Sequence, residues 1–266
     1  MTEEAHRLLD QARKLVHLQY EPHDRSGPQA AELMALENYD RGETLNPLGL
    51  PLANGDVFKV GARHYVLLEQ PCYLQVRSNG KRGRETPCLM LLKLGARERD
   101  SNNPTGRPGW ELPLGHELGA DVRDIFFTPR HPVAITVLDL CTMNQEGQAR
   151  YCGAHGASTK PPLTPGLRRL QDDRLKHFER LARQVSETLG ALKENQPQQI
   201  HDRIVAAVLG GQGPVKVSFS SDESAVITYT CERVVRLAST YADAALSAFH
   251  VHEARAAHEH DLGRFR

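Results

Sequence analysis

Four cationic side chains crowd into eight residues of the sequence, Arg77-Ser78-Asn79-Gly80-Lys81-Arg82-Gly83-Arg84. Asn-Gly tolerates the positive φ values of a tight turn, so the stretch is predicted to close a hairpin with a basic tip. Such a tip can neutralise phosphates, which gives salt-dependent affinity for nucleic acid of any sequence. With Arg63 from a neighbouring predicted turn, the candidate nucleic-acid site consists of Arg63, Arg77, Lys81, Arg82 and Arg84. The alternative is a solvated hairpin whose charges keep a sheet edge from pairing with other chains.

A second candidate is a zinc site at Cys141, Cys152 and His155, because thiolate and imidazole are ligands that zinc prefers. Three ligands do not close a structural zinc site, and a fourth would have to come from a distant residue such as Cys72 or Cys88. The alternative is that the cysteines are free thiols that pack as small hydrophobic side chains. We therefore expect no cofactor, and zinc remains the one open possibility.

The motifs of the chain do not assemble a catalytic site. Four histidines near the C-terminus stand at gaps of two, six and two residues, whereas a helical His-Glu-x-x-His site needs a gap of four. The glycine-rich run at 209–214 lacks the Lys-Ser/Thr of a phosphate-binding loop. Gly-x-Ser-x-Gly elbows, kinase signatures and dinucleotide fingerprints do not occur. Whether the protein is an enzyme stays open, and the sequence favours a protein that is not.

The composition is that of a soluble globular protein, with 39% hydrophobic residues among 266 and 33 Lys+Arg against 33 Asp+Glu. Because its formal net charge is zero, the protein lacks the overall electrostatic attraction to nucleic acid that a basic protein has. The longest apolar run, at 88–92, is far shorter than the ~18–20 residues of a membrane span. The acidic start does not resemble a secretory signal, and five widely spaced cysteines are typical of reduced thiols. We expect a cytoplasmic protein that does not associate with membranes.

The elements that would position these residues follow from the hydrophobic period. The first forty residues show apolar positions three and four apart, which predicts two short N-terminal helices. The stretch 97–109 is rich in Arg, Asp, Asn, Pro and Gly and predicts a mobile loop. Closely spaced turn signals without intervening helices favour an antiparallel, strongly curved, barrel-like sheet. β-branched and aromatic residues predict its strands at 57–60, 64–68, 73–77, 89–94, 125–127 and 133–138.

From Thr164 the hydrophobic period returns to that of a helix, with Thr164 as N-cap and Pro165 in the first turn. One apolar stripe among many charges predicts a long amphipathic helix. The stripe either covers the sheet, which is the default, or offers a face to a protein partner. Its members are Leu167, Leu170, Phe178, Leu181, Val185, Leu189 and Leu192. A second helix at 198–209, a hairpin at 214–230 and a last helix from 239 to about 262 are predicted to follow.

Three stretches of the chain resemble uncharacterised bacterial proteins of a Gly-Asp, Gln-Pro-Cys-Asp-Leu, Arg-x-x-Gly-x-Arg type, which are associated with mobile-element and phage-defence loci. They are Gly55-Asp56-Val57-Phe58, Tyr65 to Cys72 and Arg77 to Arg82, and Tyr73 stands where the pattern has aspartate. The residues 241–244 and 258–262 resemble the C-terminal helix of those proteins. The Gly-Asp strand opening is also similar to the SH3-like barrels of MazF/PemK toxin endoribonucleases. That similarity implies RNA cleavage only by analogy of fold.

Together these observations predict an α+β protein with an antiparallel, SH3-like, barrel-like sheet. N-terminal helices at 1–53 precede the β domain at 54–160, and a helical segment with the hairpin occupies 161–266. The leading functional hypothesis is a non-enzymatic interaction or regulatory subunit of a bacterial, possibly phage-defence, system, which binds a protein partner or itself. The alternative is a nucleic-acid-binding or RNA-cleaving module centred on the basic residues.

Overall fold

The computed structural model describes the greater part of the chain from Asn38 onward, with side chains as far as Arg255. The described residues are 38–96, 109–112, 118, 124–153, 163–192, 197–210, 213–221 and 224–263. The predicted N-terminal helices before residue 38 and the predicted loop at 97–108 lie outside the described residues.

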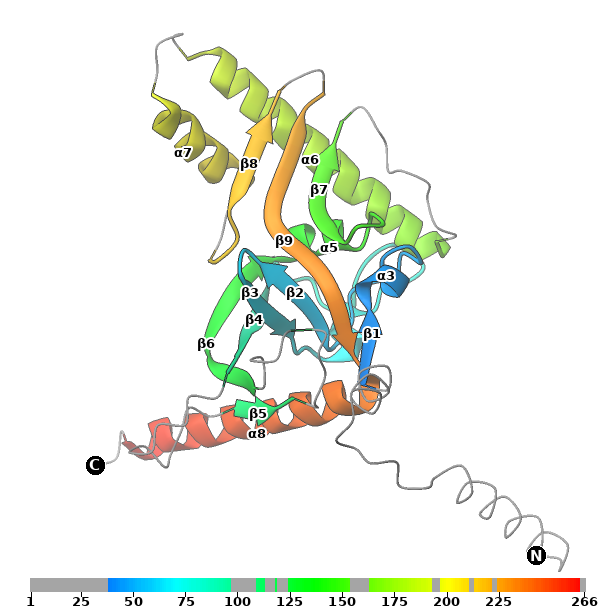
Figure 1. The fold of residues 1–266 in the computed structure, drawn as a ribbon, viewed down its shortest axis with the longest axis vertical. Helices are drawn as coiled ribbons and strands as arrows, with labels where there is room; N and C mark the ends of the chain where they lie inside the picture. Colours follow the sequence, from blue (N-terminus) through cyan, green and yellow to red (C-terminus); the bar gives the residue numbers. More distant parts are fainter. Residues whose placement is uncertain are drawn as a thin grey trace, which may run out of the picture.

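The described strands form one nine-stranded antiparallel sheet in the order β1-β9-β2-β3-β4-β6-β5, and β7 and β8 also pair with β9 (Figure 1). The protein is therefore α+β, as predicted. The predicted barrel is wrong, because the described sheet is open, with β1 and β5 at opposite ends of that order. The strands are β1 (Tyr39–Arg41), β2 (Asp56–Val60), β3 (Arg63–Leu67), β4 (Cys88–Gly95), β5 (Gly109–Glu111), β6 (Asp124–Ala134), β7 (Gln148–Cys152), β8 (Val217–Ser220) and β9 (Val226–Leu237).

The long strand β9 explains why the sheet extends instead of closing. The first half of β9 pairs with β7 and β8, and its second half pairs with β1 and β2. The partners of β9 therefore follow one another along its length, β7 and β8 first and then β1 and β2. In Figure 1 β9 runs from its hairpin with β8 at the top down to the start of α8. Strands from the ranges 1–53, 54–160 and 161–266 all join this one sheet.

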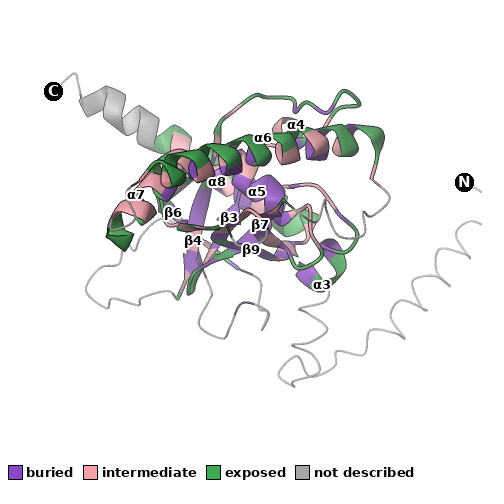
Figure 2. Cartoon of the chain, turned by 90° about the horizontal axis from the view of Figure 1, so that it is seen from above, coloured by how far each residue is buried: buried purple, intermediate pink, exposed green. Residues whose placement is uncertain are grey.

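Helices pack on both faces of the sheet, because buried side chains alternate between the two faces along the strands. One hydrophobic core contains Phe58 and Leu67 together with residues of α5 (Ile135–Cys141), α6 (Pro165–Gly190) and α7 (Gln198–Leu209). A second core contains Val57 and Val66 together with residues of α8 (Ser239–Gly263). Figure 2 shows α5 buried beneath α6, whose outer face is exposed.

The helices after residue 163 lie where the hydrophobic period predicted them. The Thr164 hydroxyl accepts a hydrogen bond from the Leu167 amide at 3.5 Å, which satisfies one of the free N–H groups at the start of α6. The helix α7 ends at Gly210 in the left-handed conformation, with φ at 68°, where glycine carries no steric cost. The predicted hairpin at 214–230 corresponds to β8 and the first part of β9.

Two strand predictions are wrong. Residues 73–77 do not form a strand, because Pro71 begins the short helix α4 (Pro71–Leu74), a position that suits the fixed φ of proline. In place of the predicted strand at 133–138, strand β6 ends at Ala134 and helix α5 begins at Ile135. A further short helix, α3 (Gly42–Leu45), directly follows β1. A continuous apolar run such as Val133-Ala134-Ile135 is compatible with a buried strand and a buried helix alike.

Replacing Phe178 with alanine tests whether the apolar stripe of α6 belongs to the core. Phe178 is fully buried against Tyr151 and Tyr229, so we expect Phe178→Ala to lower the free energy of unfolding by about 3–5 kcal/mol in urea denaturation. Leu48→Ala, at a side chain that is 56% exposed, should change it by less than about 0.5 kcal/mol. Equal effects of the two substitutions would contradict this packing.

Candidate binding cleft

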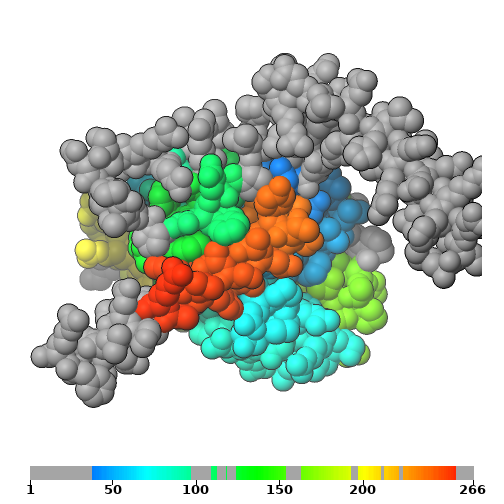
Figure 3. All heavy atoms as spheres, turned by 90° about the horizontal axis from the view of Figure 1, so that it is seen from below, coloured from blue at the N-terminus to red at the C-terminus, as the bar shows by residue number. Residues whose placement is uncertain are grey.

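A cleft of about 710 Å³ opens where four segments that are distant in sequence meet. The segments are Leu48 to Asn54, α4 with the two residues after it, the start of α6, and the end of β9 with the start of α8; Asp40 of β1 completes the described lining. Figure 3 shows them side by side on one face of the molecule, in blue, cyan, yellow-green and orange. The volume lies within the ~300–1,000 Å³ range of ligand sites, and the lining is mostly apolar.

The apolar lining comes from all four segments. Leu48 stands out because its side chain is 56% exposed, although it is large and apolar. The apolar lining residues are Leu48, Leu50, Pro51, Leu52, Ala53, Pro71, Leu74, Val76, Leu163, Leu167 and Leu237.

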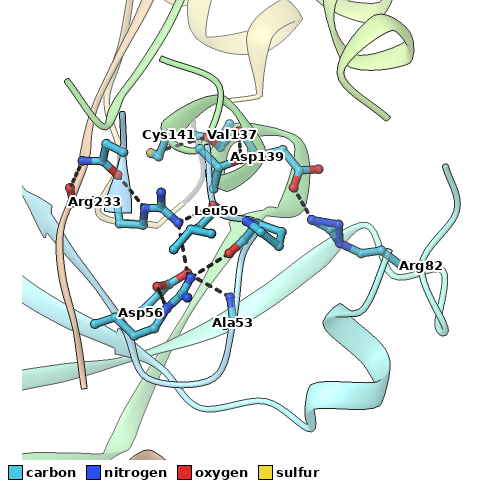
Figure 4. A network of polar contacts seen from close by, with 12 residues as sticks. Leu50, Ala53, Asp56, Arg82, Val137, Asp139, Cys141 and Arg233 are labelled. Atoms are coloured by element: carbon cyan, nitrogen blue, oxygen red, sulfur yellow. Dashed lines mark hydrogen bonds and ion pairs between the residues drawn. The ribbon is translucent and has the colours of Figure 1, made fainter. Parts of the chain in front are cut away.

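One wall of the cleft, the segment 46–54, is attached to β9 by two arginines (Figure 4). Arg236 binds both carboxylate oxygens of Asp56, at 2.7 and 3.3 Å, and donates to the Pro51 carbonyl at 2.7 Å. Arg233 donates to the Leu50 carbonyl and to Asn46 Oδ1, each at 2.8 Å. These contacts fix the path of the segment without any regular secondary structure between Asn46 and Asp56.

The Asp56 carboxylate is fully buried, and so is Arg233, which lies 3.7 Å from it. Asp56 also accepts a hydrogen bond from the Ala53 amide at 2.9 Å. Burial lowers the pKa of Arg233, and the neighbouring Asp56 opposes that shift. The charge of Asp56 is thus met by two guanidinium groups and one amide, which satisfies a buried carboxylate.

Gly147 permits the close approach of this network to the turn before β7. Its φ is +74°, and a Cβ atom there would overlap the Asn46 side chain and the Arg233 carbonyl. The same two groups are joined by a hydrogen bond of 3.0 Å from Asn46 Nδ2. Only glycine fits both the backbone conformation and the contact.

The exposed charged groups among the described lining residues are carboxylates. Asn54 is 8% exposed and donates from Nδ2 to Asp243 at 3.0 Å, while its Oδ1 has no partner among the described residues. Asp40 and Asp243 add two exposed carboxylates. The one cation among the described lining residues, Arg236, is already bound to Asp56. The cleft is therefore suited to a ligand that brings N–H donors and apolar groups.

The basic stretch 77–84 packs against the start of α6, next to the cleft but outside its described lining, and its members have different roles. Arg82 is buried and forms an ion pair with Asp139 of α5, which also binds Arg174 of α6 at 2.8 Å. Burial raises the pKa of the Asp139 carboxyl, and the two guanidinium groups oppose the rise. Arg82 therefore joins the loop to α5 and is not available to bind phosphate from solution, which corrects that part of the predicted nucleic-acid site.

The other members of the predicted nucleic-acid site are exposed, but they do not form one group. Lys81 lies 3.8 Å from the Glu85 carboxylate, and the guanidinium of Arg84 lies over the Tyr73 ring at 5.2 Å. Arg77 is exposed on the same loop. Arg63 belongs to β3, on the hairpin with β2, and acts electrostatically on His131 of β6.

The predicted zinc ligands are not brought together. Cys141 is buried with its sulfur 3.9 Å from that of Cys231, whereas Cys152 pairs with Val226 and contacts Ser224. Val226 and Cys231 are five residues apart on β9, about 16 Å along the strand, so Cys141 and Cys152 lie beside different parts of β9. His155 lies outside the described residues. Among the described residues, no cluster of His, Cys, Asp or Glu is arranged to hold a metal ion.

The apolar stripe of α6 faces the interior of the protein. Leu170, Phe178 and Val185 are buried, and Leu181 and Leu189 are partly buried against the same core. Leu167 and Leu192 are intermediate in exposure, and Leu167 also lines the cleft. Of the two alternatives for the stripe, the described side chains show that it covers the sheet.

Sequence reasoning missed the two buried ion-pair clusters and the cleft. Asp139 lies between leucines in a buried run, and Arg233 lies between Glu232 and two valines, so a charge inside an apolar pattern was the available signal. The cleft itself had no such signal, because its lining comes from residues about 200 positions apart.

Comparisons with known proteins do not place the chain in a family. No family model, curated protein or solved structure matches it. No helix in the described ranges combines the length and apolar character needed to cross a bilayer.

Substituting Asp56 with asparagine tests the attachment of the segment 46–54. The change leaves Arg233 buried without its charge partner, so we expect the free energy of unfolding to fall by about 3–5 kcal/mol in urea denaturation. Asp40→Asn removes an equal charge at an exposed position on the same cleft and should cost less than about 0.5 kcal/mol. A loss below about 1 kcal/mol for Asp56→Asn would show that the network does not hold the wall in place.

Proposed function

We propose that the protein is a non-enzymatic interaction subunit whose cleft binds a segment of a partner protein. The segment carries cationic or amide donors among apolar side chains. The observation that supports this proposal is the pairing of an apolar lining with the exposed carboxylates of Asp40 and Asp243.

The chemistry of the lining favours a protein segment over a reaction centre. The cleft contains no histidine, cysteine or lysine in its described lining, and its arginine is occupied by Asp56. General acid–base or nucleophilic catalysis needs a reactive group and a partner within hydrogen-bond reach, and no such pair lines the cleft in the described residues. Recognition by burial and hydrogen bonding needs only the groups that are present.

The position of Leu48 supports a large ligand. An exposed leucine at the edge of an apolar cleft becomes buried when a partner covers it, and such patches mark interaction sites. Asp40 and Asp243 add negative charge, so a cationic segment would associate faster and bind more tightly than an acidic one. The phage-defence setting and the RNA-cleaving alternative rest on the sequence resemblance and stay predictions.

A pair of defined peptides tests this proposal by fluorescence anisotropy. The first is a labelled 12-residue peptide in which two leucines alternate with two lysines along the sequence. The second peptide has the same sequence with every Lys replaced by Glu. We expect the Lys peptide to bind at least about tenfold more tightly, because its charge complements the two carboxylates. Leu48→Ser and the double substitution Asp40→Asn, Asp243→Asn should each weaken its binding by about threefold or more.

Met90 provides the matched control, because it is 47% exposed on β4, away from the cleft lining. Met90→Ser should leave the affinity for the Lys peptide unchanged. The proposal fails if the two peptides bind equally, if neither binds, or if Met90→Ser weakens binding as much as Leu48→Ser. A dimer in light scattering that Leu48→Ser dissociates would identify the occupant as a second copy of this chain.

A further inference from the structure

Arg63, Lys93 and His131 lie on one face of three adjacent strands, β3, β4 and β6. Tyr65 of β3 pairs directly with Lys93 of β4, and Leu91, two residues before Lys93, pairs with His131 of β6. Residues two apart on a strand share a face, so Arg63, Tyr65, Lys93, Leu91 and His131 all point the same way. Directly paired side chains lie ~5 Å apart and diagonal neighbours ~7–8 Å apart.

The side chains of this basic triad, Arg63, Lys93 and His131, remain accessible to solvent. Arg63 is exposed, and Lys93 and His131 are intermediate. Beneath them Tyr65 is buried, and its ring meets the His131 ring edge-on with centroids 5.2 Å apart. That contact restricts the orientation of the imidazole, so the triad has a fixed member on a rigid sheet.

The described charges that act on His131 are positive. In the described part of the chain, the charged groups that act on His131 are Lys93 and Arg63, and both, together with burial, lower its pKa. Asp124 of β6 pairs with Gly95, two residues beyond Lys93 on the same face, and Glu111 pairs with Asp124, but neither carboxylate is among the groups that act on His131. Arg130 and Pro132, on either side of His131, point to the other face of the sheet. The triad thus brings together cations that repel one another, and a bound anion would reduce that repulsion.

We propose that Arg63, Lys93 and His131 form a binding site for a phosphate group. The phosphate belongs either to a single-stranded nucleic acid or to a small phosphorylated molecule. This site goes beyond the proposed function, since it shares no residue with the cleft and stands on separate observations. Arg63 supplies a planar fork of donors, Lys93 a mobile ammonium, and His131 a ring N–H that becomes a second cationic donor when protonated.

The site should bind phosphate more tightly at lower pH. Without ligand, His131 is neutral at pH 7 because its pKa is lowered. A bound anion favours the protonated imidazole and raises that pKa, so binding takes up a proton. Affinity therefore increases as the pH falls toward the pKa of His131 in the complex, and this increase depends on His131 itself.

The test measures binding of the full-length protein to a fluorescein-labelled 20-nucleotide polyuridine RNA at pH 7.5 and 5.5 across a salt series. We expect affinity to weaken steeply with salt and to rise by about fivefold or more on acidification. Arg63→Gln and Lys93→Gln should each reduce the salt slope by about one. His131→Gln should have little effect at pH 7.5 and should remove the gain at pH 5.5.

The opposite face of β3 and of its neighbour β2 provides matched controls. Lys59 of β2 pairs with His64 of β3 on that face, and the pKa of His64 is likewise lowered by burial and by Lys59. Lys59→Gln and His64→Gln remove the same charge and the same imidazole from the neighbouring surface. They should leave the affinity and its pH dependence unchanged within about twofold, because the triad does not include them.

A second arm distinguishes the two sources of phosphate. Pyrophosphate that raises the melting temperature and competes with the RNA, both effects being lost in Lys93→Gln, would identify a small phosphorylated ligand. RNA binding that pyrophosphate does not displace would identify a nucleic acid. The proposal is overturned if neither probe binds, or if the pH dependence of binding persists in His131→Gln. It is also overturned if Lys59→Gln weakens binding as much as Lys93→Gln does. Binding that is abolished only by Arg77→Gln and Lys81→Gln would place the site on the basic loop instead and would likewise overturn it.

Discussion

The buried carboxylate of Asp56, bound by Arg233 and Arg236, is the interaction on which the candidate cleft depends. It connects the segment 46–54, which has no regular secondary structure, to β9, the strand that pairs with β1, β2, β7 and β8. A buried ion pair often contributes little net stability, because desolvation offsets the Coulomb attraction. Here the guanidinium groups also bind the carbonyls of Leu50 and Pro51, so the interaction fixes the path of the chain and thereby the shape of the cleft.

A second buried aspartate, Asp139, plays a corresponding part in α5. Asp139 of α5 binds Arg82 from the basic loop and Arg174 from α6, so it joins a loop and two helices. In both places one carboxylate faces two arginines. The two clusters show why a neutral protein of this size can hold charges in its interior, since each buried charge has partners from different elements.

The sequence predicted the elements with a strong period and did not predict their assembly. The helices α6, α7 and α8 and the strands β2, β3 and β4 appear at the predicted residues, because their apolar positions repeat over several turns or pleats. The apolar run around Ile135 was ambiguous, and the partners of β9 depend on contacts across 180 positions. Arg82 was predicted to bind phosphate, because a charged side chain in a loop gives no indication of a buried carboxylate 57 residues away.

Amide hydrogen exchange over the segment 46–54 tests the central claim most directly. In the native protein the amides of Asn46, Gly49, Leu50 and Ala53 are hydrogen-bonded, so they should exchange slowly. In Arg236→Met, which keeps much of the side-chain volume and removes the guanidinium, these amides should lose protection while those of α6 keep theirs. Unchanged protection of the segment in that variant would contradict the claim that the arginines of β9 hold the wall of the cleft.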